Sequence, residues 1–233
     1  MSPRARKSER RTDALSRERI IDAAVELLDA AGEGGLTFRV LTERLATGPG
    51  AIYWHVANKG ELLDAATEAV VASALAIGPV EPPASPQDGI RAVALGLFDA
   101  IDEHPWLAAQ LATQLSRSPS RSVTPRILES IGRQVSALGV PVSSQFTAAS
   151  ALMHYILGAA GQNAVNGRAA GPDVDRGEFL DAASKAWKEL DPDDYPFTRA
   201  VADQMRAHDD RAEFLAGIAL ILAGITTVHP PTA

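Results

Sequence analysis

The chain contains no cysteine in its 233 residues. Disulfide bonds and thiolate metal sites are therefore excluded, and the composition is compatible with a reducing compartment. Apolar residues make up 46% of the chain. They form no uninterrupted run of about 18 residues, which is the length that a membrane-spanning helix needs. No apolar signal core follows the basic N-terminus. We therefore expect a cytoplasmic protein with no membrane association.

The residue patterns of common enzyme sites are also missing. The five histidines are scattered, and none forms a His-x-x-x-His or HExxH pair that could bind a metal. Asp191, Asp193 and Asp194 make a carboxylate cluster, but the neighbouring prolines favour a turn. The sequence has neither a glycine-rich phosphate loop nor a GxSxG motif. We therefore predict no enzymatic activity, no metal site and no cofactor.

Apolar residues recur at helical spacing, with no strand-like alternation and no internal repeat. We predict an all-α fold of about nine or ten helices, including one at 176–190 and a short one at 197–207. The longest pattern, 143–166, is rich in small residues, which let another helix approach closely. The last pattern, 213–227, is almost free of charge and must be buried on several sides. We expect helices near 143–166 and 211–227 to form a four-helix bundle across the two-fold axis of a homodimer.

Charge is distributed unevenly along the chain. The net charge of −7 alone argues against binding to nucleic acid. Residues 1–60, however, hold ten basic against eight acidic side chains, whereas residues 61–233 hold twelve against twenty-one. Seven of the basic residues lie within residues 1–19. This distribution is typical of a protein that presents one end to phosphate, although a basic arm can also serve only for solubility.

A helix-turn-helix is predicted within residues 36–63. Leu36 and Leu41 can form a hydrophobic staple around Thr37, which is a suitable N-cap for the first helix. Pro49 suits the first position of the second helix, because its missing N–H is not needed there. The spacing therefore predicts two short helices with a tight turn between them.

The second short helix, 49–56, would carry an exposed aromatic cluster. Ile52 and Val56 lie four residues apart and can face the core. The residues on or beside the opposite face are Gly50, Ala51, Tyr53, Trp54 and His55. Three exposed rings on so short a helix indicate a contact surface, and core packing is the alternative. We expect the Tyr53 ring to pack on the neighbouring helix and its hydroxyl to reach a phosphate.

A third helix, 58–77, follows directly, because Asn58 and Glu61 have the spacing of a capping box. The segment GPGAIYWHVANKGELLDA, with LTFRVLTERLA before it, resembles the DNA-binding domain of the tetracycline-repressor (TetR) family. The resemblance covers roughly residues 16–65. One departure is Ala46, where the family usually has glycine, so the turn is either closed differently or strained.

The resemblance implies a set of DNA contacts. Thr37 and Arg39 would touch the backbone and a base, and Lys59 would reach a phosphate. The residues that would enter the major groove or line its edge are Pro49, Gly50, Ala51, Tyr53, Trp54 and His55. Because the helix begins with Gly-Pro-Gly, few side chains can read bases there. We expect sequence choice to depend on Arg39, Tyr53, His55 and DNA shape.

A second candidate site lies in the acidic part of the chain. Its residues mix aromatic, amide and soft apolar side chains, as ligand pockets between helices do: Phe98, Trp106, Gln110, Gln114, Met153, His154, Tyr155, Gln162 and Asn163. Ordinary core packing is the alternative for each of them. The resemblance implies that a pocket exists but does not place it. Since the set contains no arginine or lysine, we expect a small hydrophobic effector.

These observations predict a disordered basic arm at 1–15, a helix-turn-helix head at 16–60, and a helical ligand-binding and dimerisation domain at 61–233. The predicted function is a ligand-responsive, homodimeric transcriptional repressor, released from a palindromic double-stranded DNA operator by a hydrophobic small molecule. Two alternatives stay open. One is a DNA-binding protein with no small-molecule ligand, and the other is a protein-interaction adaptor that retains the head.

Overall fold

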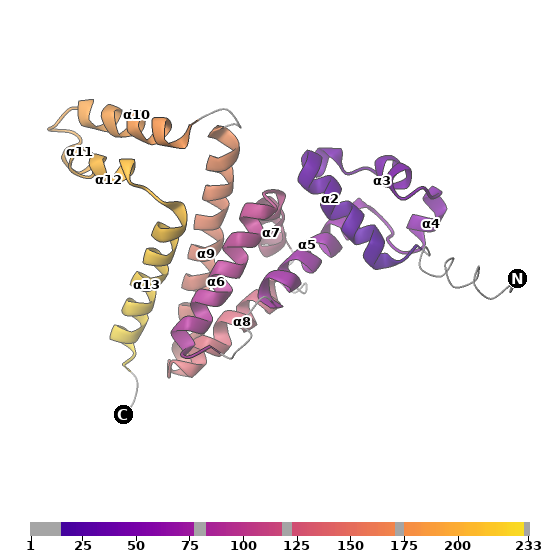
Figure 1. The fold of residues 1–233 in the computed structure, drawn as a ribbon. Helices are drawn as coiled ribbons and strands as arrows, with labels where there is room; N and C mark the ends of the chain where they lie inside the picture. The colour runs from indigo at the N-terminus through magenta and orange to yellow at the C-terminus, as the bar shows by residue number, and fades with distance from the viewer. Residues whose placement is uncertain (1–14, 77–82, 118–122, 171–174, 231–233) are drawn as a thin grey trace, which may run out of the picture. The chain divides into compact units, whose positions relative to one another are not determined.

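The computed structural model describes residues 15–76, 83–117, 123–170 and 175–230 (Figure 1). Within these ranges every regular element is a helix, and the twelve helices are α2 to α13. The predicted all-α class is therefore confirmed, with somewhat more helices than expected. The predicted basic arm lies outside the described residues, apart from Leu15.

The chain divides into two compact units. The first contains the end of α6 (Pro86–Glu103) from Asp99 and the start of α8 (Val123–Ala137) up to Ile127. Its complete helices are α2 (Arg17–Gly35), α3 (Phe38–Arg44), α4 (Pro49–Tyr53), α5 (Lys59–Ala76) and α7 (Trp106–Arg117). Helices α5 and α7 therefore belong to the same unit as the predicted head, although both extend beyond residue 60.

Helix α2 provides much of the core of the first unit. The Ser16 side chain accepts a hydrogen bond of 3.2 Å from the backbone N–H of Arg19, so Ser16 is the N-cap. The apolar side of the helix is buried through Ile20, Ile21, Ala23, Ala24, Leu27 and Leu28. Near its end, Gly32 has φ 62 and ψ −169, a backbone region that essentially only glycine adopts. Glycine at this position therefore allows the kink in α2.

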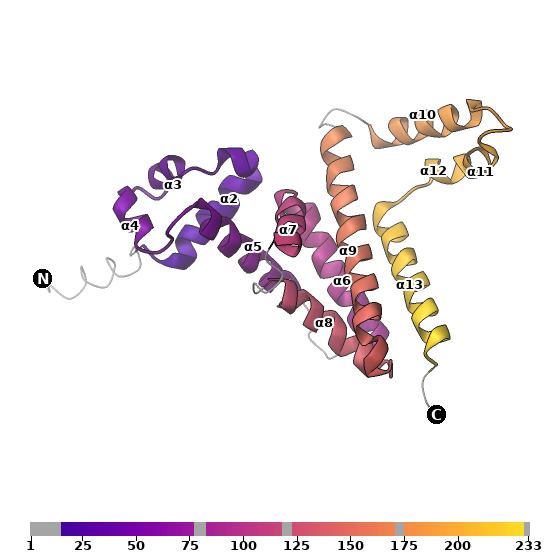
Figure 2. The ribbon, with the colours of Figure 1, turned by 180° about the vertical axis from the view of Figure 1, so that it is seen from behind.

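The second unit contains most of α6 (Pro86–Glu103) and α8 (Val123–Ala137), together with α9 (Val142–Ala170) and α13 (Asp210–Val228). Helices α9 and α13 pack side by side (Figures 1 and 2). A Cβ atom at Gly217 would lie 1.9 Å from the Tyr155 hydroxyl oxygen. Glycine in α13 therefore leaves the space that the Tyr155 ring of α9 occupies.

Helix α9 is longer than the sequence predicted. The sequence predicts a loop over residues 167–177, but the chain is helical as far as Ala170. A single glycine costs a helix about 1 kcal/mol relative to alanine, which lowers helix propensity without ending the helix.

Three short helices, which we call the arm, follow α9 in the second unit: α10 (Arg176–Glu189), α11 (Pro196–Ala200) and α12 (Ala202–Arg206) (Figure 2). The expected single helix at 197–207 is two helices, because Val201 has φ −94 and ψ 0. Helix α10 packs on α12. Lys188 Nζ lies 2.5 Å from Asp203 Oδ1, and Arg206 Nε lies 2.8 Å from Asp181 Oδ1.

Helix α13 is apolar on most of its circumference. By length and composition alone it could cross a membrane. Only 17% of its most apolar stretch of 18 residues is buried within the chain. Its first turn carries Asp210 and Glu213, however, and the uncharged remainder is shorter than the roughly 18 residues of a typical span. Leu220 is 75% exposed within the single chain. An apolar surface of this kind is typical of a helix that packs against a partner.

Candidate nucleic-acid interface

Helix α3 begins as the sequence predicted. The Thr37 side chain accepts a hydrogen bond of 3.2 Å from the backbone N–H of Val40. Leu36 and Leu41, on either side of this cap, are fully buried. The hydroxyl of Thr37 therefore satisfies a free N–H at the helix start, while the two leucines anchor it to the core.

The turn between α3 and α4 contains strained backbone. Ala46 has φ 49, and it is the only residue other than glycine with positive φ in the described part of the chain. The turn is closed by hydrogen bonds from Ala46 N to Glu43 O at 3.3 Å and from Thr47 N to Thr42 O at 3.1 Å. The strained alternative foreseen from the sequence is therefore the one the structure adopts.

Helix α4 ends at Tyr53, earlier than the predicted residue 56, and both Tyr53 and the C-cap residue Trp54 are exposed to solvent. Ile52 and Val56 are buried beneath it, whereas Tyr53 is 52% exposed and Trp54 is 88% exposed. The Tyr53 ring stacks on Phe38 of α3 at a centroid distance of 4.6 Å. The expected contact between Tyr53 and the neighbouring helix is therefore present, and about half of the Tyr53 side chain stays exposed.

The remaining residues of this surface follow from the same geometry. Gly50 and Ala51 are exposed on α4, and His55 is half-buried just after it. Pro49 occupies the first turn of α4, as predicted, and Gly48 precedes it without a side-chain cap. The exposed surface therefore carries only small side chains at the start of α4 and aromatic ones at its end. Small side chains allow the backbone to approach the floor of a DNA groove closely.

The capping box at the start of α5 forms with one variation. Asn58 Oδ1 accepts a hydrogen bond of 2.9 Å from Glu61 N. Glu61 Oε2 accepts one of 2.8 Å from Ala57 N, one residue before the cap. This arrangement fixes the angle at which the chain passes from α4 into α5.

Two basic residues of the predicted interface are engaged within the protein. Arg39 Nη1 lies 3.1 Å from Glu43 Oε1 one turn along α3, and both side chains are exposed. Lys59 Nζ donates a hydrogen bond of 2.6 Å to the backbone oxygen of Glu33 at the end of α2. An exposed ion pair of this type contributes little to the free energy of unfolding. Arg39 can therefore leave Glu43 for another partner at little cost in stability.

The residues of the predicted pocket fall into two groups, one in each unit. In the first unit, Trp106, Gln110 and Gln114 project from one face of α7, and all three donate hydrogen bonds to carboxylates of α2 and α5. Their role in ligand binding stays a prediction.

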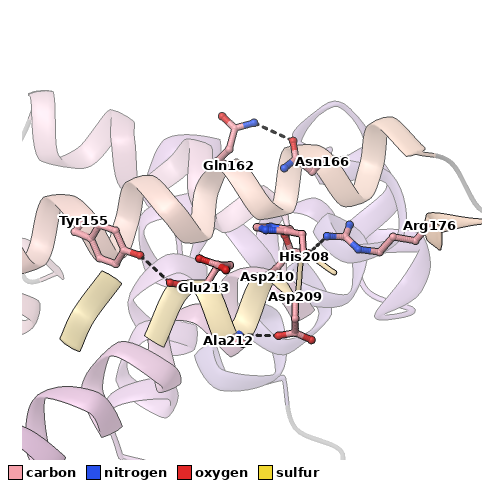
Figure 3. A network of polar contacts seen from close by, with 9 residues as sticks. All are labelled: Tyr155, Gln162, Asn166, Arg176, His208, Asp209, Asp210, Ala212 and Glu213. Carbon is pink, nitrogen blue, oxygen red and sulfur yellow. Dashed lines mark hydrogen bonds and ion pairs between the residues drawn. The ribbon is translucent and has the colours of Figure 1, made fainter. Parts of the chain in front are cut away.

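In the second unit, Phe98 and Tyr155 both contact the ring of Phe214, at centroid distances of 4.6 Å and 5.9 Å. The Tyr155 hydroxyl donates to the Phe214 backbone oxygen at 3.2 Å. It also lies 3.4 Å from the Glu213 backbone oxygen, which is the contact drawn in Figure 3. Burial and the nearby Glu213 raise the pKa of this hydroxyl. Met153, two residues before Tyr155 in α9, is also buried. This group is an aromatic cluster that joins α6, α9 and α13.

The other predicted pocket residues are distributed along α9. His154 is exposed, Asn163 is half-buried, and Gln162 is exposed with its amide donating to Asn166 Oδ1 at 2.9 Å (Figure 3). Within the described residues, no group of three or more histidine, aspartate or glutamate side chains could hold a metal ion.

Phe214 was not among the residues predicted from the sequence, and neither were the acceptors Asp29, Glu33 and Asp64. Phe214 stands at the start of an apolar run, where nothing indicates that Phe98 and Tyr155 converge on it. Acidic residues on a helix are usually solvated, so the three carboxylates carried no signal in the sequence.

The buried side of α4, its exposed rings and the capped helices around it define a helix-turn-helix DNA-binding protein. A family model described as bacterial regulatory proteins, tetR family, matches residues 20–66. A second, described as the tetracyclin repressor-like C-terminal domain, matches residues 79–229. The chain belongs to the TetR family. It is a DNA-binding transcription regulator and not an enzyme.

Named relatives agree with this assignment. An HTH-type transcriptional regulator of Saccharopolyspora erythraea is 32% identical over 162 residues, which cover 70% of this chain and 66% of that protein. The class D tetracycline repressor protein of Escherichia coli is 48% identical over 58 residues, covering 25% of this chain and 27% of the repressor. The matches therefore span two thirds or less of these relatives' length.

Solved structures show the same fold. The transcriptional regulator SCO7222, a TetR from Streptomyces coelicolor, is 67% identical with a TM-score of 0.84, over 93% of this chain and 100% of that one. The TetR family protein ActR of the same organism, solved in complex with actinorhodin, has a TM-score of 0.73 over 94% of this chain and 100% of its own. At 23% identity, ActR supports the fold alone.

Proposed function

We propose that the protein is a homodimeric, cytoplasmic repressor that binds a palindromic operator and is released from it by a hydrophobic small molecule. The observation that carries the proposal is the surface of α4. Tyr53 at the end of α4 and Trp54 at its C-cap are exposed, whereas Ile52 of α4 and Val56, three residues after the helix ends, are buried. A short helix of this kind, rigidly held and aromatic at its tip, is suited to the major groove.

In this proposal the contacts are divided between two helices. Thr37 and Arg39 at the start of α3 contact the backbone and a base, and Lys59 contacts a phosphate. The residues that line the groove are Pro49, Gly50, Ala51, Tyr53, Trp54 and His55. Two heads of a dimer would dock in successive major grooves, about 34–36 Å apart.

The dimer would form through α9 and α13. Both helices expose large apolar side chains in the single chain, among them Phe146 and Val165 of α9 and Leu220 of α13. Burial of apolar area contributes about 25 cal/mol per Å², and two copies of a helix pair can bury it in a four-helix bundle. The family to which the chain belongs also forms dimers.

The effector would be a hydrophobic, ring-containing compound. Phe98, Met153 and Tyr155 offer apolar and aromatic contacts, whereas Gln162 and Asn163 offer amides. ActR, which has the same fold, is solved in complex with actinorhodin, so a protein of this fold can bind a small molecule. A compound that binds one conformation better would change operator affinity by linkage, since the coupling between the two sites is reciprocal.

The first test is selection of bound fragments from random DNA, followed by titration of the recovered sequence at two salt concentrations. Affinity is expected to fall steeply as salt rises, because phosphate contacts release counterions. Trp54→Ala should weaken binding at least about tenfold, as loss of a buried contact of about 1.4 kcal/mol would. Phe197→Ala removes another largely exposed ring, 76% against 88% for Trp54, from the arm and is the control.

A second comparison tests base reading. Arg39→Ala should reduce discrimination at one operator position by about 1–3 kcal/mol, whereas Lys59→Ala should weaken all sequences alike. Arg133 forms the same kind of exposed pair, with Glu129 one turn away on α8, so Arg133→Ala is the control. Equal loss on random and cognate DNA in the Arg39 variant would contradict the base contact.

The remaining outcomes decide between functions. If no DNA is bound in a salt-dependent manner, the repressor proposal is wrong and the adaptor function gains support. If operator binding is found, a thermal-shift screen of hydrophobic compounds tests the effector. A stabilising compound that does not lower operator affinity would contradict the release mechanism.

A further inference from the structure

The folded head, residues 16–60, carries no excess of positive charge. Its basic side chains are Arg17, Arg19, Arg39, Arg44 and Lys59, and its acidic ones are Glu18, Asp22, Glu26, Asp29, Glu33 and Glu43. Five basic against six acidic residues give a net charge of −1. Attraction to phosphates supplies nearly all of the affinity that a protein has for random DNA. The affinity of this head therefore depends on which of its basic side chains a DNA sequence can engage.

Most of the basic side chains of the head hold helices together. Three of them pair across two helices: Arg17 with Glu61, Arg44 with Glu26, and Lys59 with the backbone oxygen of Glu33. Arg39 pairs instead with Glu43 of its own helix, α3, and Arg39 Nη1 lies 3.1 Å from Glu43 Oε1. Breaking this pair separates no helices. Arg39 can therefore leave its partner while α2, α3 and α5 stay packed.

Helix α3 gains little stability from the pair of Arg39 and Glu43. Arg39 is the second residue of α3, and Glu43 is the second from last. The N-terminal end of a helix is partially positive and the C-terminal end partially negative, so each charge lies at the end that disfavours it. Arginine before glutamate is also the weaker order for a helical ion pair. An effect on DNA binding therefore explains the pair better than an effect on folding.

Both charges lie at the surface, next to the predicted reading residues. The side chain of Arg39 is 80% exposed and that of Glu43 is 61% exposed. Phe38, adjacent to Arg39, stacks on Tyr53 and so connects α3 to α4. A phosphate that approaches Arg39 comes within the screening length of about 8 Å from the Glu43 carboxylate, which repels it. A guanine edge, in contrast, offers arginine two uncharged acceptors.

We propose that Glu43 is a specificity-determining residue for operator recognition. On random DNA, Glu43 stays paired with Arg39 and keeps the guanidinium group from the phosphates. On the operator, two hydrogen bonds to the edge of a base replace the ion pair. Glu43 therefore lowers the affinity for random DNA more than the affinity for the operator. The inference rests on the proposed function, because it takes Arg39 as a base contact.

Glu43→Gln tests the inference, since it removes the charge and keeps the size of the side chain. Binding of the full-length protein to random DNA and to the selected operator is measured by fluorescence anisotropy at about 50 and about 200 mM salt. Random DNA should bind about fivefold more tightly at the lower salt, and this gain should shrink about threefold at the higher salt, because one more phosphate is contacted. The operator should gain only about twofold, which is the factor that a weak helical ion pair represents.

Glu129→Gln in α8 is the matched control. Glu129 forms an exposed pair with Arg133 one turn away, and its side chain is 63% exposed, against 61% for Glu43. The substitution changes the net charge equally and should leave both affinities unchanged. The double variant Arg39→Ala with Glu43→Gln shows whether Glu43 acts through Arg39. Without the guanidinium group, the loss of the Glu43 charge should change both affinities by the same factor.

The possible outcomes separate this inference from the proposed function. If the wild-type protein prefers no DNA sequence, both fall together. If the wild type prefers its operator but Glu43→Gln changes both affinities by the same factor, this inference alone is wrong. A selective gain on random DNA that persists in the Arg39→Ala background also overturns it, because Glu43 then acts without Arg39. If Glu43→Gln does not fold, Glu43→Asp shortens the side chain and must still raise the affinity for random DNA more than that for the operator.

Discussion

Replacing Ala46 with glycine is expected to stabilise the head. The residue has φ 49, and a left-handed conformation costs an L-residue with a Cβ about 1–2 kcal/mol. Its side chain is exposed, so little packing is lost. Glycine also adds conformational entropy to the unfolded chain, and this cancels about 0.4–1 kcal/mol of the stability gained by relieving the strain. We expect a net gain of about 0.5–1 kcal/mol.

The assay is urea unfolding followed by circular dichroism, with hydrogen exchange of the α3 and α4 amides as a local measure. Ala69→Gly is the matched control, because Ala69 is exposed in the ordinary helical backbone of α5. The same change should cost about 1 kcal/mol there. If Ala46→Gly destabilises the protein as Ala69→Gly does, the strain assigned to the turn is absent and the reasoning is refuted.

Two further predictions concern the second unit. Gly217→Ala should destabilise it by about 1–3 kcal/mol in thermal unfolding, because the new methyl group would displace the Tyr155 hydroxyl; Tyr155→Phe in the same chain should recover part of the loss. The hydrogen bond from Lys188 lowers the pKa of Asp203 below its usual 3.8. The stability that this hydrogen bond adds is present above pH 3.8, the usual pKa of the carboxyl group, and is lost as the pH falls through the lowered pKa of Asp203. Acid should therefore speed hydrogen exchange in the arm, and Asp203→Asn should remove that dependence.

Local signals predicted the elements well. Thr37, Asn58 and the proline at position 49 mark helix starts that the structure confirms, because each acts on backbone groups within three or four residues. The end of α9 and the break at Val201 were predicted less well. A lone glycine does not end a helix, and nothing in the residues near 201 opposes a continuous one.

The partners of the candidate site residues could not be predicted. Gln114 bonds to a residue 50 positions away and Gln110 to one 77 positions away. Periodicity assigns a residue to a face of its own helix but does not say which helix covers that face. Gln110 and Gln114, both among the predicted pocket residues, are four residues apart and share a face of α7. Their carboxylate partners depend on how α2, α5 and α7 pack together.

The three tryptophans of the chain lie in three different settings. Trp54 is almost fully exposed at the tip of the reading helix, and Trp106 is buried with its indole N–H on Asp29. Trp187 is half-buried in α10 of the arm. Intrinsic fluorescence can therefore follow each part without a label: variants that retain one indole would report groove contact, the joint between α7 and the head, and the arm as separate optical signals.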